Sequence, residues 1–347
     1  MTAMASTYNR PGTRETDLDL FGRVSAGIIA EVKRVIVGQD DVLNGALVGL
    51  LTGGHVLLEG VPGLGKTRLV RALASALDLA YSRVQFTPDL MPADITGTNI
   101  IADDPSGVRR FRFEPGPVFA NLLLADEVNR ATPKTQSALL EAMAESQVTV
   151  ANIAHRLPEP FMVLATQNPL EMEGTYPLPE AQLDRFAYKI LVTFPTLEEL
   201  TAILDLTTGD TAPTVTPVAS APEILRLQSL IRQVPMGQHV RDYVARLVLG
   251  THPDQRDATR FVRQYVRFGA SPRAGQALIL AGKVYALLDG RYNVGFEDIR
   301  RAAHIALRHR LLLNFEAEAD GISTDAVIDQ IVMTLRTEEM ADRGRAS

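Results

Sequence analysis

Short apolar runs alternate with longer segments of helical periodicity along the first half of the chain. Each run suits a strand buried in a parallel sheet, and apolar residues one helical turn apart predict helices between the runs. The predicted strands are His55–Leu58, Ser82–Phe86, Asn121–Ala125, Phe161–Thr166 and Lys189–Val192. The predicted helices are Leu18–Val35, Asp40–Leu51, Thr67–Leu77, Thr132–Glu145 and Glu180–Arg185. This alternation predicts an α/β fold with a parallel sheet sandwiched between helices.

Two further segments alternate apolar and polar residues with a period of two, as exposed β-hairpins do. Val108–Phe113 (VRRFRF) interleaves arginine with apolar residues. Gln147–Val150 is followed by a polar return through His155 and Arg156. We expect the arginine-rich arm to have one solvated face and one packed face. Contact of this arm with nucleic acid is the alternative interpretation.

The pattern changes near Pro195 and becomes wholly helical. Thr196 and Glu199 form a capping box that opens a helix to Leu206, and a linker rich in Thr, Pro and Ala follows over 207–221. No strand is expected after this linker. The later predicted helices are Pro222–Val234, Val240–Leu249, Ala274–Leu288, Phe296–Arg308 and Thr324–Leu335. We therefore expect a disordered tail over 1–17, an α/β core over 18–195 and a small helical lid over 196–347.

Composition narrows the class of protein. The 347 residues suit about two domains, and an apolar content of 46% allows a full buried core. The chain has no cysteine, which excludes a disulfide framework and thiolate metal sites. Its formal net charge of −6 argues against nucleic acid as the main partner. No apolar run approaches the roughly 20 residues that span a bilayer, and the N-terminus lacks a signal-peptide core, so a cytoplasmic protein is predicted.

The strand at His55–Leu58 leads into Gly60–Thr67 (GVPGLGKT), which fits the phosphate-loop pattern G-x-x-x-x-G-K-[ST]. Its glycines let successive backbone N–H groups converge on a phosphate, and the following helix adds the positive end of its dipole. Lys66 is placed to reach the β- and γ-phosphates, and the Thr67 hydroxyl to bind Mg²⁺. The predicted ATP-binding residues here are Gly60, Val61, Pro62, Gly63, Leu64, Gly65, Lys66, Thr67 and Arg68.

Two strand ends supply candidate groups for hydrolysis. Asp126 closes an apolar strand, where its carboxylate can hold Mg²⁺ through water, and Glu127 can orient and deprotonate the attacking water. Asn168 follows the next predicted strand, where a neutral amide can sense the γ-phosphate. The alternatives are an acidic pair that only ends a strand and a simple Asn-Pro turn.

Two arginines are candidates for contact with the transition state. Arg185, in LPEAQLDRF, could act on the nucleotide of a neighbouring subunit; a surface ion pair with Asp184 or Glu180 is the alternative. Arg273, in GASPRA, could touch the γ-phosphate from the start of a lid helix and couple nucleotide state to domain angle. The alternative for Arg273 is an ordinary arginine at a helix start.

Together these residues resemble the MoxR family of AAA+ ATPases, and the resemblance extends from Val37 to Leu335. The strings that carry it are EGVPGLGKT at Glu59–Thr67, ADEVNRA at Ala125–Ala131, ATQNP at Ala165–Pro169, EGTYPLPEAQLDRF at Glu173–Phe186, GASPRA at Gly269–Ala274 and LRHRLLLNFEA at Leu307–Ala317. The resemblance implies a P-loop AAA+ core with hairpin inserts, followed by a helical lid. It also implies assembly into a ring, usually a hexamer.

The resemblance assigns roles to individual residues. The segment Val37, Gly38 and Gln39 would lie by the adenine base. Asn168, Arg185 and Arg273 match sensor 1, the arginine finger and sensor 2, and Arg130 matches a second intersubunit arginine. The arm at Val108–Phe113 corresponds to the helix-2 insert and Gln147–Arg156 to the hairpin before the sensor strand. Both inserts face the pore or substrate side in relatives.

The implied activity is that of a Mg²⁺-dependent ATP-hydrolysing motor. Such motors are chaperone-like remodellers or assembly factors for protein clients, with von Willebrand A-domain partners. The alternatives are a magnesium-chelatase-type motor subunit, a nucleic-acid-stimulated helicase-like ATPase and a metabolic P-loop kinase. The acidic balance weighs against the helicase-like ATPase, and a kinase leaves the helical lid unexplained.

Overall fold

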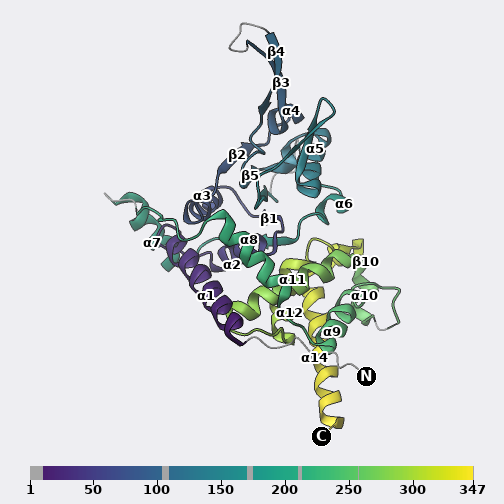
Figure 1. The fold of residues 1–347 in the computed structure, drawn as a ribbon. Coiled ribbons are helices and arrows are strands. Elements are labelled where there is room, and N and C mark those ends of the chain that lie inside the picture. Colours follow the sequence, from purple (N-terminus) through teal and green to yellow (C-terminus); the bar gives the residue numbers. More distant parts are fainter. Residues whose placement is uncertain (1–10, 104–108, 170–174, 210–212, 257, 347) are drawn as a thin grey trace, which may run out of the picture.

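A five-stranded sheet forms the centre of the first half of the chain in the computed structural model (Figure 1). The structure describes residues 11–346 apart from 104–108, 170–174, 210–212 and 257. The strand order is β2-β5-β8-β1-β9 and every pairing is parallel, so the carboxyl ends of the strands meet at one edge. The strands are β1 (Val56–Glu59), β2 (Tyr81–Gln85), β5 (Leu122–Asp126), β8 (Met162–Gln167) and β9 (Tyr188–Leu191). The predicted α/β fold is confirmed.

The two faces of the sheet belong to two different apolar clusters, because successive side chains of a strand point to opposite faces. Leu122 and Leu124 of β5 lie in the cluster that contains the buried side chains of α2 and α3. Leu123 and Ala125 lie in the cluster that contains those of α5. The covering helices are α2 (Asp40–Thr52), α3 (Lys66–Ala76) and α5 (Pro133–Glu145). Continuous apolar runs were therefore the correct signal for these strands.

Two hairpins extend from the core. A short helix, α4 (Pro92–Thr96), precedes the hairpin β3 (Gly97–Asp103) and β4 (Arg109–Pro115), and β6 (Gln147–Val150) pairs with β7 (Ile153–Arg156). The β3–β4 hairpin projects away from the body of the protein (Figure 1).

The prediction that the β3–β4 arm has one packed face is wrong over most of the length of the arm. Phe111 is 77% exposed and its cross-strand partner Ile101 is 64% exposed, because the arm extends beyond any second layer. Phe113, nearer the body, stacks on His155 of β7 with ring centroids 3.9 Å apart. Val108, at the start of the predicted arm, lies outside the described residues, as do Glu173 and Gly174 of the string matched at Glu173–Phe186.

A group of helices follows the sheet along the chain, and most of the group lies below the sheet in Figure 1. Its helices are α7 (Leu197–Thr208), α8 (Ala221–Gln233), α9 (Gln238–Leu249), α10 (Arg260–Tyr265), α11 (Pro272–Leu288), α12 (Phe296–Leu307), α13 (Phe315–Ala319) and α14 (Thr324–Ala346). The expectation of no strand in this half is wrong, because β10 (Val266–Phe268) and β11 (Leu312–Leu313) form an antiparallel pair. Strands of three and two residues are too short for periodicity to reveal.

The first helix begins earlier than expected. Helix α1 (Pro11–Lys33) includes the second part of the predicted disordered tail, while residues 1–10 lie outside the described residues. The polar stretch PGTRETD shows no apolar period, but proline suits a first helical position. Helix α1 contacts both α3 and α11, and one apolar cluster runs from the core into the lid. No helix in the described part of the chain is long and apolar enough to cross a membrane.

Candidate nucleotide-binding and hydrolysis site

The phosphate loop joins the carboxyl end of β1 to the start of α3, as the motif requires. Gly65 precedes α3 with φ 77°, a left-handed conformation that glycine adopts without strain. A Cβ on Gly60 would lie 2.7 Å from the carbonyl oxygen of Val192, the residue after β9, so only glycine fits there. The Gly60 N–H donates to the Gln167 carbonyl over 3.2 Å. The loop therefore begins beside the end of β8.

Lys66 is buried inside the curve of this loop. Its Nζ donates to the carbonyl oxygens of Gly60, at 2.7 Å, and Val61, at 3.3 Å. Burial lowers the pKa of Lys66, while the nearby carboxylates of Asp126 and Glu127 act in the opposite direction. The ammonium group therefore lies between the phosphate loop and the two candidate acids.

Asp126 ends β5 and both of its carboxylate oxygens are hydrogen-bonded. The Thr166 hydroxyl donates to Oδ1 over 2.6 Å. Arg83 on β2 donates to Oδ2 from Nη2 at 2.7 Å and from Nε at 3.2 Å. The sequence offered no signal for Arg83, because its partner comes from a strand far away in the chain.

The residues at this edge also fit a magnesium ion. Hydroxyl and carboxylate oxygens are the ligands that Mg²⁺ prefers, and Thr67 and Asp126 supply one of each. Each carboxylate oxygen has two lone pairs, so Asp126 can accept a metal-bound water besides its present partners. Thr67 occupies the first turn of α3, directly after the loop.

Glu127 adopts a left-handed backbone conformation with φ 56°, which is uncommon for a residue other than glycine. Its N–H donates to the Thr166 hydroxyl over 2.8 Å, which ties the turn to β8. Its carboxylate oxygen Oε2 accepts from Gln85 Nε2 and from Arg130 Nη1, each at 2.9 Å. Arg130, expected to face a neighbouring subunit, thus contacts the acid of its own chain. Such strained turns are often found at functional sites.

Asn168 lies at the same edge as the phosphate loop. It follows β8 directly and is buried. The register of β8 against β1 pairs Gln167 with Glu59, the residue before the loop. The structure therefore places Asn168 at the same edge of the sheet as Lys66 and the acidic pair at the end of β5.

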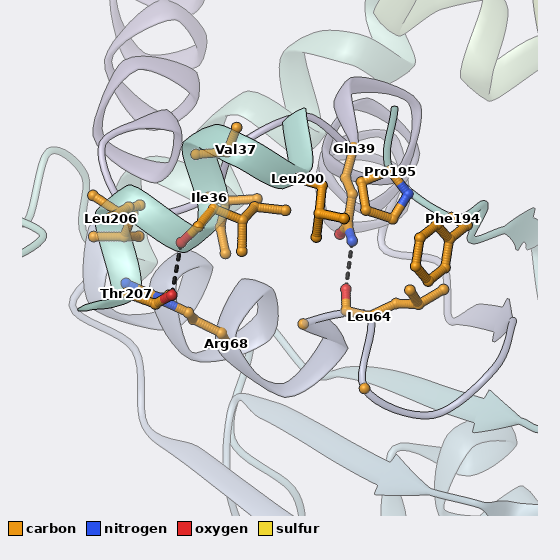
Figure 2. A pocket seen from close by; sticks show the side chains of 14 residues that line it. Ile36, Val37, Gln39, Leu64, Arg68, Phe194, Pro195, Leu200, Leu206 and Thr207 are labelled. Carbon is orange, nitrogen blue, oxygen red and sulfur yellow. Dashed lines mark hydrogen bonds between the residues drawn. The ribbon is translucent and has the colours of Figure 1, made fainter. Parts of the chain in front are cut away.

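An apolar pocket of about 300 Å³ adjoins the phosphate loop (Figure 2). Its lining comes from the turn after α1, from the phosphate loop and first turn of α3, and from the segment through α7. The predicted residues among its lining are Val37, Gln39, Gly63, Leu64, Gly65 and Arg68, and the further residues are Val35, Ile36, Phe194, Pro195, Leu200, Ile203, Leu206 and Thr207. Apolar walls of this kind suit a flat aromatic base.

The turn that carries Gly38 and Gln39 is held by two different elements. The Gln39 side chain donates from Nε2 to the Leu64 carbonyl of the phosphate loop. Gly38 has φ 65°, and a Cβ there would lie 2.4 Å from Oε1 of Glu199 on α7. The turn is thus fixed between the loop and α7, the two walls of the pocket.

Arg185 and Arg273 lie away from the phosphate loop of their own chain. The register of β1 and β9 sets Glu59 beside Leu191 at the loop end and Val56 beside Tyr188 at the other end. Tyr188 therefore lies three residue steps, roughly 10 Å of strand, from the loop edge, and Arg185 precedes Tyr188 by three more residues.

Both arginines are exposed and sit near each other. The Arg185 Nη1 donates to the Leu140 carbonyl over 2.8 Å. Arg273 begins α11, as expected, and its Nη1 lies 3.3 Å from Oδ2 of Asp184. Asp184, an alternative partner considered for Arg185, is instead engaged by Arg273 and Arg310. The sequence did not indicate that Arg185 and Arg273 would lie close together in space.

Comparison with known proteins agrees with this geometry. Residues 55–188 match the ATPase family associated with various cellular activities (AAA), and residues 258–331 match the AAA lid domain. The protein named Chaperone MoxR1 of Mycobacterium tuberculosis is 47% identical over 88% of this chain and 80% of its own length. Protein MoxR of Paracoccus denitrificans is 32% identical over 88% of this chain and 94% of its own length.

A solved structure is similar over nearly the whole chain. It is the crystal structure of a candidate ATPase from Cytophaga hutchinsonii, with a TM-score of 0.87 and 42% identity, and the match covers 93% of this chain and 97% of that one. The phosphate loop, the acids at the end of β5 and the helical lid of this chain agree with the family of these relatives. The chain belongs to the MoxR family of AAA+ ATPases.

Proposed function

We propose that this protein is a Mg²⁺-dependent ATPase that hydrolyses ATP at sites formed between subunits of a ring. The observation that carries the proposal is the separation, within one chain, of the phosphate loop from Arg185 and Arg273. A nucleotide on the loop of one chain would then take its arginines from the next chain. Such a head-to-tail interface uses two different surfaces and closes into a ring, as a hexamer in the manner of the family.

In this mechanism the chain's own residues bind and orient the substrate. Backbone N–H groups of the phosphate loop and the start of α3 hold the phosphates, and Lys66 neutralises their charge from inside the loop. The pocket beside Val37 and Gln39 receives the base. Thr67 and Asp126 would hold Mg²⁺, which when bound would neutralise part of the charge of the phosphates.

Proton removal is assigned to Glu127. Its carboxylate stays oriented because Gln85 and Arg130 both donate to Oε2. A water between this carboxylate and the γ-phosphate would lose its proton to Glu127 as its oxygen bonds to the γ-phosphorus, and the bond from that phosphorus to the bridging oxygen would break to release ADP. Asn168, at the same edge, would orient that water or the γ-phosphate by its amide. Arg185 and Arg273 of the next subunit would stabilise the charge that develops on the transferred group.

The work done with this energy is the remodelling or assembly of a protein client. One relative is named a chaperone, which supports this role, and a von Willebrand A-domain protein is the partner expected for the family. The exposed Ile101 and Phe111 of the β3–β4 arm supply apolar surface that such a client could contact.

The test is an assay of phosphate release by the purified protein. We expect Mg²⁺-dependent turnover of ATP without any added acceptor, and no stimulation by single- or double-stranded DNA. Turnover that rises several-fold with DNA would favour the helicase-like alternative. Turnover that requires a small-molecule acceptor would favour a kinase.

A further inference from the structure

Three consecutive residues of the lid bind the backbone of the core where Arg185 is located. Arg308 donates to the Lys189 carbonyl over 3.1 Å, and His309 donates from Nε2 to the Phe186 carbonyl over 2.9 Å. Arg310 binds the same segment through several nitrogens. These residues lie in the string LRHRLLLNFEA at Leu307–Ala317, which has no role in the hydrolysis site described above.

Arg310 brackets Arg185 on both sides. Its Nη2 donates to the carbonyls of Asp184, at 3.3 Å, and Phe186, at 2.8 Å, and its Nη1 donates to Ala187 at 3.0 Å. The Arg310 side chain is only 2% exposed. The backbone position of Arg185 is therefore fixed by an arginine of the lid, although the Arg185 side chain itself points to the surface.

The Asp184 carboxylate joins this buried arginine to the start of α11. Its Oδ1 accepts from Arg310 Nε and from the Ser271 hydroxyl, each at 2.7 Å, and its Oδ2 lies 3.3 Å from Arg273 Nη1. Ser271 also caps α11, since its Oγ accepts from the Arg273 N–H. A buried guanidinium requires a paired counter-charge, and Asp184 supplies it.

We propose that Asp184 and Arg310 form a clamp that positions Arg185 and Arg273 together for the nucleotide of the next subunit. This inference rests on the proposed function, because it requires both arginines to act in trans. Asp184 is then a positioning residue. It touches no nucleotide, and its carboxylate sets the distance between an arginine of the core and an arginine of the lid. A displacement of about 1 Å in such a group can reduce the rate by about 100-fold.

The experiment uses mixed assemblies of two full-length chains. The donor chain carries Lys66→Ala, so its own site is inactive but its arginines are intact. The acceptor chain carries Arg185→Ala and Arg273→Ala, so its phosphate loop is intact but it offers no arginines. Activity of the mixture then comes only from donor arginines at acceptor loops.

Asp184→Glu, which keeps the charge but shifts the carboxylate, is added to either the donor or the acceptor. Asp184→Asn, which removes the charge, is added in parallel.

The clamp predicts an asymmetric result. Asp184→Glu in the donor should lower kcat of the mixture by about tenfold or more, with nucleotide affinity unchanged. The same substitution in the acceptor should leave kcat within about twofold, because no arginines there need positioning. Equal losses from both placements would indicate a role in folding alone and overturn the clamp, as would full activity with the altered donor. If the unaltered donor and acceptor fail to complement each other, the trans site itself is refuted together with the clamp.

Discussion

The Glu127 carboxylate and the Gln85 side-chain amide lie 2.9 Å apart, at the carboxyl ends of the neighbouring strands β5 and β2. Gln85 is thus in place to hold the proposed base in one orientation. The contact links two residues that are 42 positions apart in the chain. It depends on the pairing of β2 with β5, which brings Gln85 opposite Asp126.

Removing the proposed base should separate binding from hydrolysis. Glu127→Gln keeps the shape of the side chain but cannot take a proton, so kcat should fall by about 10²- to 10⁴-fold. The Kd for ATP should stay nearly unchanged, because Glu127 is not part of the phosphate loop. Phosphate release and equilibrium nucleotide binding measure the two quantities. Glu318→Gln, an exposed acid of the lid, is the matched control, and equal turnover of both variants would refute the role of Glu127.

Removing Arg185, which is exposed and lies away from the phosphate loop of its own chain, should also leave nucleotide binding intact. Arg185→Ala should lower kcat by about 10³-fold, the lower end of the range of about 10³- to 10⁵-fold for arginine fingers. Nucleotide affinity should be preserved because Arg185 lies away from the loop of its own chain. Arg263→Ala, which removes an exposed arginine of the lid, is the control. A rise in Kd with little change in kcat would mean that Arg185 acts on ground-state binding.

The apolar pocket predicts a different result for two positions on α7. Ile203 lines the pocket, whereas Leu197, on the same helix, is 79% exposed and lies outside it. Ile203→Asn should weaken ATP binding about tenfold, equivalent to about 1.4 kcal/mol, with kcat at saturation little affected. Leu197→Asn should leave the Kd unchanged. Titration with a fluorescent ATP analogue measures both, and equal affinities would exclude this pocket as the base site.

A buried histidine should make stability fall in mild acid. His55 Nδ1 accepts from the Val163 N–H and its Nε2 donates to the Met143 carbonyl, each over 3.0 Å, so protonation would break the first contact. Burial lowers the pKa of His55 from 6.5 to about 4. The unfolded chain therefore binds the extra proton first, and the contribution of His55 is complete above pH 6.5 and declines toward pH 4.

The size of this effect can be measured by urea unfolding at pH 7.5 and 5.5. At pH 5.5, one unit below the unfolded-state pKa of 6.5, His55 should lower the free energy of unfolding by about 1.4 kcal/mol relative to pH 7.5. His309, whose pKa is also lowered by burial, should add to the loss. A His55→Gln variant should show a drop that is smaller by about 1.4 kcal/mol. An identical drop in the variant would exclude His55 as a source.

The sequence predicted the parts of this protein that local patterns determine. Buried strands such as β5 and β8 are continuous apolar runs, and the phosphate loop is a contiguous motif whose glycines are needed at their own positions. The acids at the end of β5 and Asn168 after β8 could be assigned to one edge because parallel strands end together.

The remaining features depend on which strands and helices become neighbours. Arg83 binds Asp126 only because β2 pairs with β5, and Arg310 binds Asp184 only because the lid docks against the segment that leads into β9. The distance of Arg185 from the loop likewise follows from the register of β9, and Arg273 lies near Arg185 because it contacts Asp184. Exposure of Phe111 depends on how far the arm extends beyond the core, which alternation alone does not determine.

The central claim is that one chain cannot complete its own hydrolysis site. The most direct measurement is the turnover of ATP per chain as the protein is diluted, with the mass of the particles followed by light scattering at each concentration. We predict that turnover per chain rises in step with assembly and is nearly lost where the protein is monomeric. Full turnover by a particle with the mass of a single chain would contradict the account.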